Sequence, residues 1–386
     1  MERITLVGFG LLASSIASAI KQANLPVKVR AVSSPSTLDR AREMKLADEF
    51  FLYDQTEQWA RDTDVILLCS PILHILKTLE NLSRLSSDFL QSVSASQNKK
   101  ILVSDIGSTK VEICKAGSKL PAPFVFVGSH PMAGSEKRTL EYNDPSIFEN
   151  AYWFVCPPDG TPEEDYKPLL QLINFVGAHS VVFPPEHHDR TMAWVSHMPQ
   201  MLSSTLAGNI PERLLNYNYQ HYAGRAFRDM TRIAASGWNM WHDIAVTNRS
   251  ETVRALREVR EGLDETIAAM DSLVVVNDGK PAADDCSDKL EKVFKAGNDG
   301  RASLFAPGRN AAANFAEITV PLKDQPGALL NVLRPLAEAG INVRDIELMK
   351  VRENVAGTLL LAFKTPEEAR RAIQILGVLD YDVKER

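Results

Sequence analysis

Residues 8–13 read GFGLLA, a GxGxxA motif that suits the binding of a nucleotide. Gly8 permits a tight turn, Gly10 lets the backbone approach a pyrophosphate, and Ala13 is small enough for the following helix to pack on the preceding strand. The diphosphate would lie on the free amides at the start of that helix. In the alternative interpretation, the glycines only join a strand to a helix.

His130 lies in GSHPMAGSE, 128–136, directly after the apolar run 124–127. We therefore expect it just beyond the carboxyl end of a sheet strand, where ligands bind in doubly wound folds. An imidazole there can accept a proton from a hydroxyl group while a nicotinamide accepts the hydride. Ser108, in DIGSTK, could reach the same crevice and orient His130. Alternatively, His130 only bonds a loop carbonyl and Ser108 only closes a turn.

The second half of the chain contains cationic groups for an anionic substrate. Arg225, Asp229 and Arg232 stand at i, i+4 and i+7, which would put them on one helix face. Two arginines so placed could hold a carboxylate bidentately, but a solvated salt-bridge ladder has the same spacing. His197 precedes Pro199 in a helical pattern, and the proline should bend that helix beside a pocket.

We expect neither a metal site nor a disulfide framework. His187, His188 and Asp189 are adjacent, so on a helix their side chains point about 100° apart, and the chain has no HExxH spacing. We interpret them as a helix-start cluster. The four cysteines lie far apart without CxxC spacing, which is typical of reduced thiols.

The first part of the chain has the pattern of an α/β fold. Strand-like runs alternate with helical patterns such as 39–45 and 72–85; the runs are RITLVG, VKVRAV, DVILLCSP, ILVSDIG, FVFVGSHP and YWFVCPP. A helix over 165–176 and a run at 180–185 complete the pattern. It predicts a doubly wound parallel sheet in a Rossmann-type domain of residues 1–185.

Two further domains should follow. Long helical patterns, including 251–276, predict an all-α domain of residues 186–300, whose leftover apolar stripe favours a homodimer. Residues 277–314, rich in Gly, Asp, Pro and Ala, should form a loose connection with one short helix at 290–295. Residues 315–386 have the order βαββαβ of a ferredoxin-like fold: strand 316–322, helix 327–339, strands 342–351 and 358–363, helix 366–376 and a strand near Tyr381.

Composition argues against two classes of partner. The 386 residues are 45% hydrophobic and 24% charged, as in ordinary globular proteins, and the net charge of -6 disfavours nucleic acid, which calls for a clustered basic face. No apolar run reaches the roughly 18 residues of a membrane span. We therefore expect a cytoplasmic protein.

Five motifs occur together in register: the glycine fingerprint, DIGSTK, GSHPMAGSE, HHDRTMAWVSHMP and FRDMTRIAAS. Their order and separations resemble those of the prephenate dehydrogenase family of tyrosine biosynthesis, over about residues 1–275. The resemblance implies oxidative decarboxylation of prephenate to 4-hydroxyphenylpyruvate. Hydride would pass from the carbinol carbon to NAD(P)+ while the opposite ring carbon loses carbon dioxide.

The resemblance also implies roles for single residues. His130 matches the base that accepts the ring-hydroxyl proton, and Ser108 matches its hydrogen-bonding partner. Arg232 matches the arginine that binds the substrate carboxylate, and His197 matches the histidine that contacts substrate from the helical domain. The remaining predicted substrate-binding residues are Asp229, Glu136 and Trp241, which resemble the family's pocket entrance and gate, and Lys110, a further pocket candidate.

The second strand departs from the usual NAD pattern, in which an Asp or Glu binds the ribose 2'-hydroxyl. Here the strand ends in Ser33-Ser34-Pro35-Ser36, whose hydroxyls could bond a 2'-phosphate that no carboxylate repels. The sequence thus accepts NAD or NADP and favours NADP, although no arginine follows. The predicted cofactor-binding residues are Gly8, Phe9, Gly10, Leu11, Leu12, Ser33, Ser34, Ser36, Ser70 and Asp105.

The segment DQPGALLNVLRPLAEAGINV resembles the ACT domain, the amino-acid-sensing unit of some family members. The resemblance predicts that tyrosine or phenylalanine binds between two such modules, with its carboxylate on helix N-terminal amides. Inhibition would require the module to bias the pocket between two states. The alternative is a purely structural, dimer-forming module. The predicted effector-binding residues are Asp324, Pro326, Gly327, Ala328 and Asn342.

Two other functions stay open. Arogenate carries an ammonium where prephenate has a ketone, so the same base would serve an arogenate or dual cyclohexadienyl dehydrogenase. A protein of another class, a non-catalytic nucleotide or amino-acid sensor, would keep the nucleotide fold and the ACT module without turnover. The presence of His130, Ser108 and Arg232 argues against the sensor.

Overall fold

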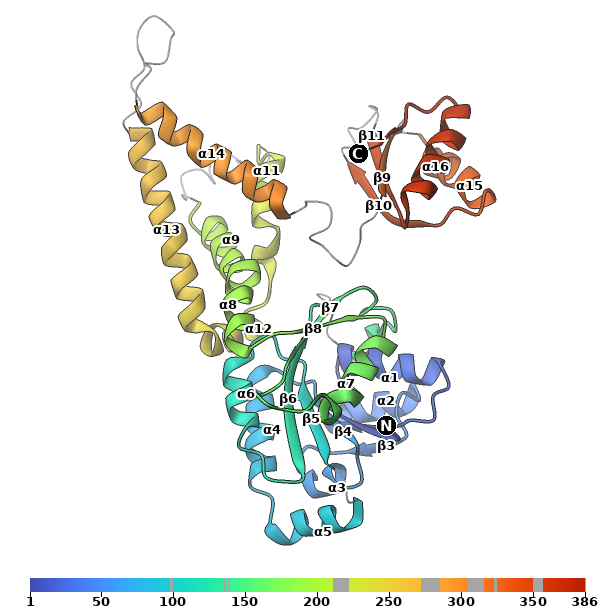
Figure 1. The fold of residues 1–386 in the computed structure, drawn as a ribbon, viewed down its shortest axis with the longest axis vertical. Helices are drawn as coiled ribbons and strands as arrows, with labels where there is room; N and C mark the ends of the chain where they lie inside the picture. The colour runs from blue at the N-terminus through green and yellow to red at the C-terminus, as the bar shows by residue number, and fades with distance from the viewer. Residues whose placement is uncertain are drawn as a thin grey trace, which may run out of the picture. The chain divides into compact units, whose positions relative to one another are not determined.

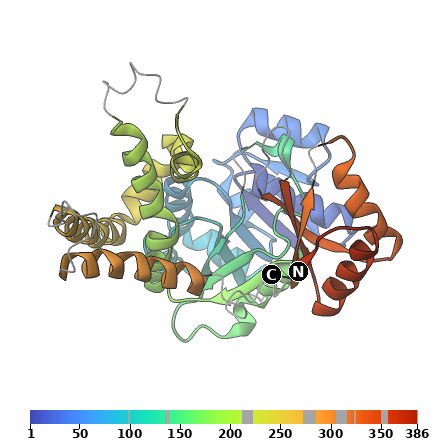
Figure 2. The same ribbon diagram turned by 90° about the horizontal axis from the view of Figure 1, so that it is seen from above.

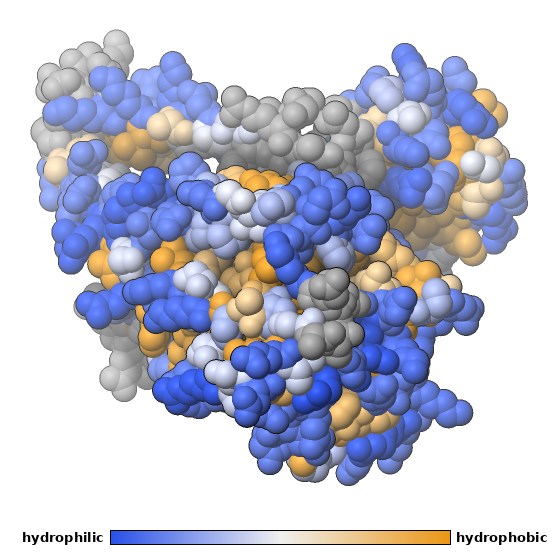
Figure 3. Space-filling view, turned by 60° about the horizontal axis from the view of Figure 1, so that its bottom comes forward, coloured by the Kyte–Doolittle hydropathy of each residue, from blue (hydrophilic) through white to orange (hydrophobic). Residues whose placement is uncertain are grey.

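The computed structural model describes residues 1–97, 100–134, 137, 139–210, 222–271, 285–304, 316–322, 325–349 and 357–385. These residues form two compact units, Met1–Ala268 and Ala269–Arg386, which Figure 1 shows as ribbons. No helix among these residues is long and apolar enough to cross a membrane. Hydrophilic side chains cover much of the face seen in Figure 3, with smaller hydrophobic areas between them.

The first unit contains an eight-stranded sheet with helices between its strands. The strands are β1 (Arg3–Val7), β2 (Lys28–Val32), β3 (Glu49–Phe51), β4 (Val65–Leu68), β5 (Ile101–Asp105), β6 (Phe124–Pro131), β7 (Tyr152–Cys156) and β8 (His179–Val182). The helices are α1 (Leu11–Gln22), α2 (Pro35–Glu43), α3 (Thr56–Ala60), α4 (Ile72–Ser83), α5 (Ser87–Gln97), α6 (Val111–Gly117), the 3-10 helix η1 (Leu140–Tyr142) and α7 (Glu163–Phe175).

The strand order is β3-β2-β1-β4-β5-β6-β7-β8. The first six strands are parallel and have the order of a doubly wound nucleotide-binding sheet, which confirms the Rossmann-type prediction for this part. The prediction of a wholly parallel sheet is wrong, because β6 and β7 are antiparallel. Apolar runs show where strands lie but carry no information on their direction.

The sheet is buried on both faces. In β4, Val65 and Leu67 belong to one core cluster, whereas Ile66 and Leu68 belong to the other. Because successive strand residues point to opposite faces, a continuous apolar run is what such a strand requires. Helices α1, α2 and α7 cover one face and α4 and α6 the other, as Figure 1 shows.

The described residues from 185 to 271 form helices joined by short turns, which agrees with the predicted all-α segment. Its helices are α8 (Pro185–Met192), the π turn η2 (Ala193–His197), α9 (Met198–Gly208), α11 (Arg225–Thr231), the 3-10 helix η4 (Arg232–Ala235), α12 (Trp238–Thr247) and α13 (Arg249–Asp271).

Pro199, where a bend was predicted, is the second residue of α9, and α8, the π turn and α9 follow one another without a gap. The proline lacks the N–H that would donate to the Val195 carbonyl four residues earlier. The irregularity beside it is the π turn, in which the Met198 N–H donates to the Ala193 carbonyl five residues earlier.

The second unit contains a helix that is longer than predicted. Helix α14 (Asp285–Leu304) lies in the middle of the predicted loose connection 277–314, where only a short helix at 290–295 was expected. Two glycines lower its helix propensity, but the Lys, Glu, Ala and Leu residues around them are strong helix formers.

The C-terminal module has the predicted βαββαβ order. Its elements are β9 (Ala316–Leu322), α15 (Ala328–Glu338), β10 (Val343–Met349), β11 (Gly357–Phe363), α16 (Pro366–Val378) and β12 (Lys384–Glu385). The sheet order is β10-β11-β9-β12 with antiparallel pairs. Both helices pack on one face of this sheet, as Figure 2 shows, over a core that includes Ile318, Val332 and Leu376.

Candidate active site

His130 lies near the end of β6, where the strand changes partners. Up to Val127 the strand pairs in parallel with β5, and from Gly128 it pairs antiparallel with β7, so that His130 faces Phe154 in register. The residue therefore stands in the strand itself, slightly earlier than the predicted position beyond its end. It lies at the carboxyl edge of the parallel strands, where doubly wound folds bind ligands.

A chain of hydrogen bonds orients the His130 imidazole. Its Nδ1 lies 2.9 Å from Nε2 of His188, and Nδ1 of His188 lies 2.8 Å from Oδ1 of Asp189. Because a carboxylate only accepts hydrogen bonds, Nδ1 of His188 must donate, so its Nε2 accepts from the Nδ1–H of His130. Nε2 of neutral His130 then carries a lone pair, which is the arrangement of a general base.

Asp189 is fixed by backbone groups. Its Oδ1 accepts from the Lys110 N–H at 2.6 Å, and its Oδ2 accepts from the Val111 N–H at 2.9 Å, at the start of α6. The Asn248 side chain donates to the Asp189 carbonyl at 2.7 Å and lies 3.1 Å from Nδ1 of His197. The carboxylate therefore sits at a helix N-terminus, which favours its negative charge.

Burial keeps the histidines of this network neutral. It lowers the pKa of His130 well below 6.5, and the neighbouring His188, Lys110 and His197 lower that pKa further. Burial also lowers the pKa of His188, although the hydrogen bond with Asp189 opposes this effect. The pKa of His197 falls to about 4 through burial. All of these rings are therefore neutral near pH 7.

A buried ion pair lies next to the peptide bond that leads into His130. The Lys110 ammonium donates to the Asp105 carboxylate and, at 2.7 Å, to the Ser129 carbonyl, and the side chains of Lys110 and Asp105 are 0% exposed. Burial raises the pKa of Asp105, and the ion pair with Lys110 opposes this change. This corrects the predicted substrate contact of Lys110 and cofactor contact of Asp105, because their side chains are enclosed and engaged with each other.

Ser108 lies in the loop that follows β5, as expected, and it is partly buried there. Among the described residues, the Nδ1 of His130 bonds His188, which sequence patterns did not indicate. The predicted Ser108–His130 pair stays a prediction. A serine near the strand end is simple to find in sequence, whereas the histidine that bonds His130 stands 58 residues away on α8.

Sequence patterns missed His188, Asp189 and Asn248. The pair His188–Asp189 does start a helix, as expected, but it is buried and contacts His130 rather than solvent. Adjacent side chains on a helix point in different directions, so the sequence did not indicate that these two act together. In the structure the His188 ring nevertheless bonds the carboxylate of the next residue, Asp189. No spacing in the sequence marks Asn248.

The predicted substrate residues of the helical segment fall into two groups. His197 and Trp241 are buried, and their ring centroids lie 6.1 Å apart. Asp229 and Arg232 are exposed, and the helix ends between them, because Arg232 begins the 3-10 helix η4. The predicted common face of Arg225, Asp229 and Arg232 stays a prediction. The side chain of Arg225, and all of Glu136, lie outside the described residues.

The glycine turn has the geometry that close backbone packing requires. Gly8 has φ of +95°, and a Cβ there would lie 2.6 Å from the Ser70 backbone N. Gly10 precedes α1, whose first amides have no partner within the helix. This cradle fits a pyrophosphate. Leu11 and Leu12 provide amides, but the Phe9 side chain is buried in the core, so only its backbone can face a ligand.

The serines after β2 surround the start of α2. Ser34 is the N-cap residue, and its Oγ lies 3.0 Å from Oγ1 of Thr37 and 3.4 Å from Oγ of Ser36. Ser33 is buried, so its neighbours Ser34 and Ser36 offer the accessible hydroxyls. The nearby Arg30 forms an ion pair with Glu49, with Nε of Arg30 2.7 Å from Oε2 of Glu49.

The predicted effector residues stand at the start of α15 and before β10. Pro326 and Asn342 are exposed, Ala328 is partly buried, and Gly327 has φ of +84° at the N-cap of α15. Asp324 lies outside the described residues.

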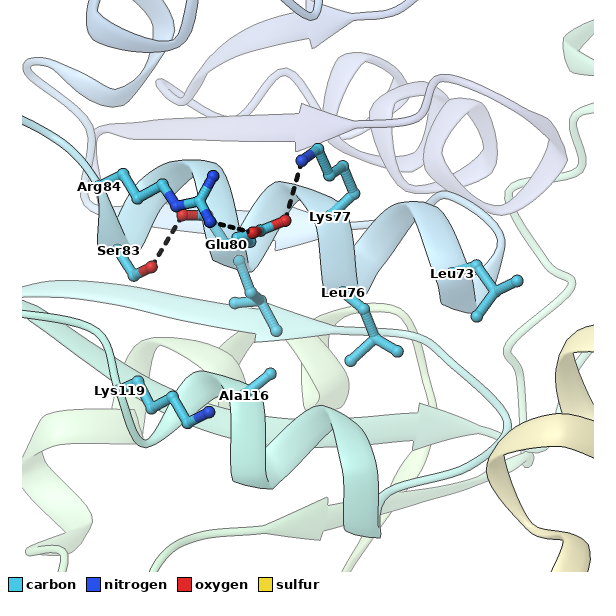
Figure 4. A pocket seen from close by; sticks show the side chains of 9 residues that line it. Leu73, Leu76, Lys77, Glu80, Ser83, Arg84, Ala116 and Lys119 are labelled. Carbon is cyan, nitrogen blue, oxygen red and sulfur yellow. Dashed lines mark hydrogen bonds and ion pairs between the residues drawn. The ribbon is translucent and has the colours of Figure 1, made fainter.

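The first unit also has a groove of about 580 Å³ between α4 and α6, drawn in Figure 4. Leu76 from α4, Ala116 from α6 and Lys119 from the turn after α6 face the space between the helices. Glu80 lies between Lys77, at 2.9 Å, and Arg84, at 2.5 Å. None of the residues lining the groove belongs to the network around His130, so the chemistry and this hollow are separate. No cluster of His, Cys, Asp and Glu that could hold a metal occurs in the described ranges.

Two family models match the chain. The model of the prephenate dehydrogenase nucleotide-binding domain matches residues 16–182, and that of the prephenate dehydrogenase dimerization domain matches residues 184–294. The chain is also 28% identical over 377 residues to a prephenate dehydrogenase of Bacillus subtilis, which covers 97% of the chain and 95% of that protein.

Solved structures have the same fold. Synechocystis arogenate dehydrogenase is 25% identical with a TM-score of 0.63 and covers 78% of this chain and 99% of its own. Prephenate dehydrogenase from A. aeolicus, solved with hydroxyphenyl propionate and NAD+, is 23% identical with a TM-score of 0.64 and covers 79% of this chain and 98% of its own. With the matches to both family models, these likenesses show that the chain belongs to the prephenate dehydrogenase family.

Proposed function

We propose that this protein is an NAD(P)-dependent prephenate dehydrogenase, which converts prephenate to 4-hydroxyphenylpyruvate and carbon dioxide in tyrosine biosynthesis. The observation that carries the proposal is the His130–His188–Asp189 chain, which leaves Nε2 of His130 with a lone pair. This chain of side chains lies at the carboxyl ends of the parallel strands, where the Gly8 turn also lies. Membership of the family supplies the substrate class.

In this reaction His130 takes the proton of the ring hydroxyl on Nε2. As that proton leaves, electron density moves toward the carbinol carbon and favours departure of its hydride. The positive charge that develops on His130 is stabilised through His188 by Asp189, which remains an acceptor throughout. Loss of carbon dioxide from the opposite ring carbon yields the aromatic ring, which makes the reaction effectively irreversible.

The substrate carboxylates need donors from the helical segment. Arg232 is exposed and can present its guanidinium to a carboxylate. The Trp241 Nε1–H is buried and has no hydrogen-bond partner among the described residues, next to His197. We assign these residues, with Asp229 and Glu136 at the entrance, to substrate binding. Their assignment follows the family resemblance.

The Gly8 turn and the first amides of α1 would hold the cofactor diphosphate. When bound, the nicotinamide supplies the hydride acceptor. We propose that NADP is accepted and preferred over NAD, because the hydroxyls of Ser34, Ser36 and Thr37 surround a helix start without a carboxylate. The preference for NADP should not be strong, because the buried Arg30 is already ion-paired with Glu49 and does not offer its charge to a 2'-phosphate.

Arogenate is the alternative substrate, and the Synechocystis relative is named as an arogenate dehydrogenase. One assay separates these possibilities and tests the function itself: purified protein with prephenate or arogenate, each with NAD+ or NADP+, following formation of the reduced cofactor. Turnover of neither substrate, with the cofactor bound, would favour the non-catalytic sensor.

We further propose that the three predicted domains, 1–185, 186–300 and 315–386, act as a nucleotide-binding, a dimerising and a regulatory module. The helical segment exposes large apolar side chains, among them Val195, Met230 and Trp238, that a second copy could cover. The C-terminal βαββαβ module would act as an ACT-like unit that binds tyrosine or phenylalanine near Pro326, Gly327, Ala328 and Asn342. Light scattering tests the homodimer. Unchanged activity and unchanged thermal stability with tyrosine and with phenylalanine would exclude the regulatory role.

A further inference from the structure

Lys110 makes three polar contacts with groups that surround His130 in the chain or in its hydrogen-bond network. Its backbone N–H donates to Oδ1 of Asp189 at 2.6 Å. Its ammonium donates to the Ser129 carbonyl at 2.7 Å and pairs with Asp105. The Ser129 carbonyl belongs to the peptide bond that leads into His130, so one residue contacts both the backbone and the hydrogen-bond chain that hold the imidazole.

A glycine on β6, Gly128, makes room for the thiol beside this lysine. A Cβ on Gly128 would lie 2.6 Å from Sγ of Cys114 and 3.4 Å from Cδ of Lys110. A side chain at position 128 would therefore displace the thiol, whereas its Cβ would only touch the lysine stem. Gly128 is also the residue at which β6 changes from its parallel to its antiparallel partner.

Enclosing a lysine and an aspartate costs desolvation free energy that a buried ion pair recovers only with good geometry and further hydrogen bonds. Here those bonds exist. Asp105 also accepts from the Gly107 N–H at 2.8 Å and from the Ser129 N–H at 3.1 Å. The pair thus ties the end of β5 to β6 at Ser129, the residue before His130.

We propose that Lys110 is a positioning residue for the general base, fixing His130 through the Ser129 peptide on one side and through Asp189 and His188 on the other. The proposal deepens the proposed function and rests on it. Lys110 does not touch the substrate, because its side chain is fully enclosed.

Charge adds to the geometric effect. His188 on α8, His197 in the π turn and Lys110 at the start of α6 each lower the pKa of His130. Because the two neighbouring rings are neutral near pH 7, the positive charge beside His130 at that pH is the Lys110 ammonium. Asp189 and Asp105 carry the negative charges of the same network. Without the lysine cation, the pKa of His130 should rise, because a positive neighbour opposes protonation of the ring.

The test compares three variants. Lys110→Met removes the ammonium and leaves Asp105 unpaired, whereas Lys110→Met with Asp105→Asn removes both charges at similar volume. Lys115→Met is the matched control, since Lys115 is an exposed lysine in the last turn of the same helix, α6. For each variant we would measure kcat and KM for prephenate, the dissociation constant of the reduced cofactor, thermal stability, and the pKa of His130 by NMR titration without substrate.

We expect kcat to fall about 100-fold in both Lys110 variants, because small misplacements of a catalytic group have effects of this size. KM and cofactor affinity should change little, and the pKa of His130 should rise. Lys115→Met should match the parent protein in every measurement. If the double variant recovered the parent kcat and His130 pKa, Lys110 would serve only to neutralise Asp105, and the proposal would be overturned.

Folding failures are also decisive. Lys110→Gln with Asp105→Asn keeps an amide donor near the Ser129 carbonyl without charge. If this variant and both Met variants all failed to fold while Lys115→Met folded, the pair would have a purely structural role, which contradicts the proposal. If the parent protein turned over neither prephenate nor arogenate, the proposed function would fail, yet the His130 titration would still test the effect of Lys110 on its imidazole.

Discussion

The network around His130 and the groove between α4 and α6 contain the same kinds of charged groups in opposite environments. Lys110 and Asp105 are fully buried and bonded to backbone and to each other. Lys77, Glu80 and Arg84 are 62%, 41% and 69% exposed. Exposed ion pairs contribute little because water solvates and screens them, whereas removing one partner from a buried pair leaves an uncompensated charge. The hollow on the surface is thus the less consequential of the two regions.

The largest effect should come from His130→Ala. Removing the base should lower kcat by about 100-fold or more, since general-base catalysis contributes roughly 10²- to 10⁴-fold. The matched control is His74→Ala, an exposed histidine on α4, which should keep the parent rate. Steady-state kinetics with prephenate measures both. Equal rates for His130→Ala and the parent protein would place the base elsewhere and remove the distinction between the two regions.

Asp189→Asn should have the next largest effect. The amide cannot accept from the Lys110 N–H, the Val111 N–H and His188 at once, because one of its two atoms is a donor. The His188 ring would lose its fixed tautomer, and we expect kcat to fall at least about 10-fold with cofactor affinity retained. Kinetics and a cofactor titration measure this. A fall in cofactor affinity alone would show that Asp189 supports the nucleotide site instead.

The buried histidines should make stability depend on pH. The pKa of His197 is about 4 in the folded protein against 6.5 when unfolded. Below pH 6.5 the unfolded chain binds a proton that the folded chain excludes, so the free energy of unfolding should fall between pH 6.5 and about 4, by up to about 3 kcal/mol for this group. The pKa values of His130 and His188 are shifted in the same direction.

Denaturant unfolding at pH 7 and pH 5 measures this dependence. His197→Asn should flatten it, and His74→Asn on the exposed face of α4 should leave it unchanged. A protein as stable at pH 5 as at pH 7 would show that the rings are solvated and can be protonated in the folded state.

Glu80→Gln should have the smallest effect. Lys77 and Arg84 are exposed and Glu80 is partly exposed, so water screens these ion pairs and their loss should leave the free energy of unfolding nearly unchanged. Activity should be unchanged. Thermal unfolding and the prephenate assay measure both quantities. A loss of activity near that of Asp189→Asn would mean that the groove is coupled to the site.

Local patterns in the sequence predicted local structure well. The six apolar runs of the first domain all became strands, because a strand buried on both faces needs continuous apolar residues. The short strand β3 was missed, since its half-buried residues EFF form no such run. The Gly8 turn could be predicted because its reason is local, a positive φ close to another strand end.

The candidate site was predicted only in part, because its geometry depends on contacts between distant segments. His130 could be found from its place after a strand. Its partner His188 lies 58 residues further along the chain, in the predicted helical domain. Lys110 is five residues from the end of β5, which suggested a pocket. Its side chain is instead buried against Asp105 and the Ser129 carbonyl, contacts that no spacing records.

The π turn at Ala193–His197 contains one residue more than an α-helical turn would need. That extra residue sets the rotation of α9 about the helix axis relative to α8. His188 and Asp189 are buried before the turn, and His197, Met198 and Gln200 are buried at its end and after it. Deleting a single residue such as Val195 would restore regular winding and rotate everything downstream by about 100°. His197 would then leave Asn248, and the inward side of α9 would turn outward. Substitutions can be tolerated at the exposed Trp194 and Val195 of this turn, but its length cannot change.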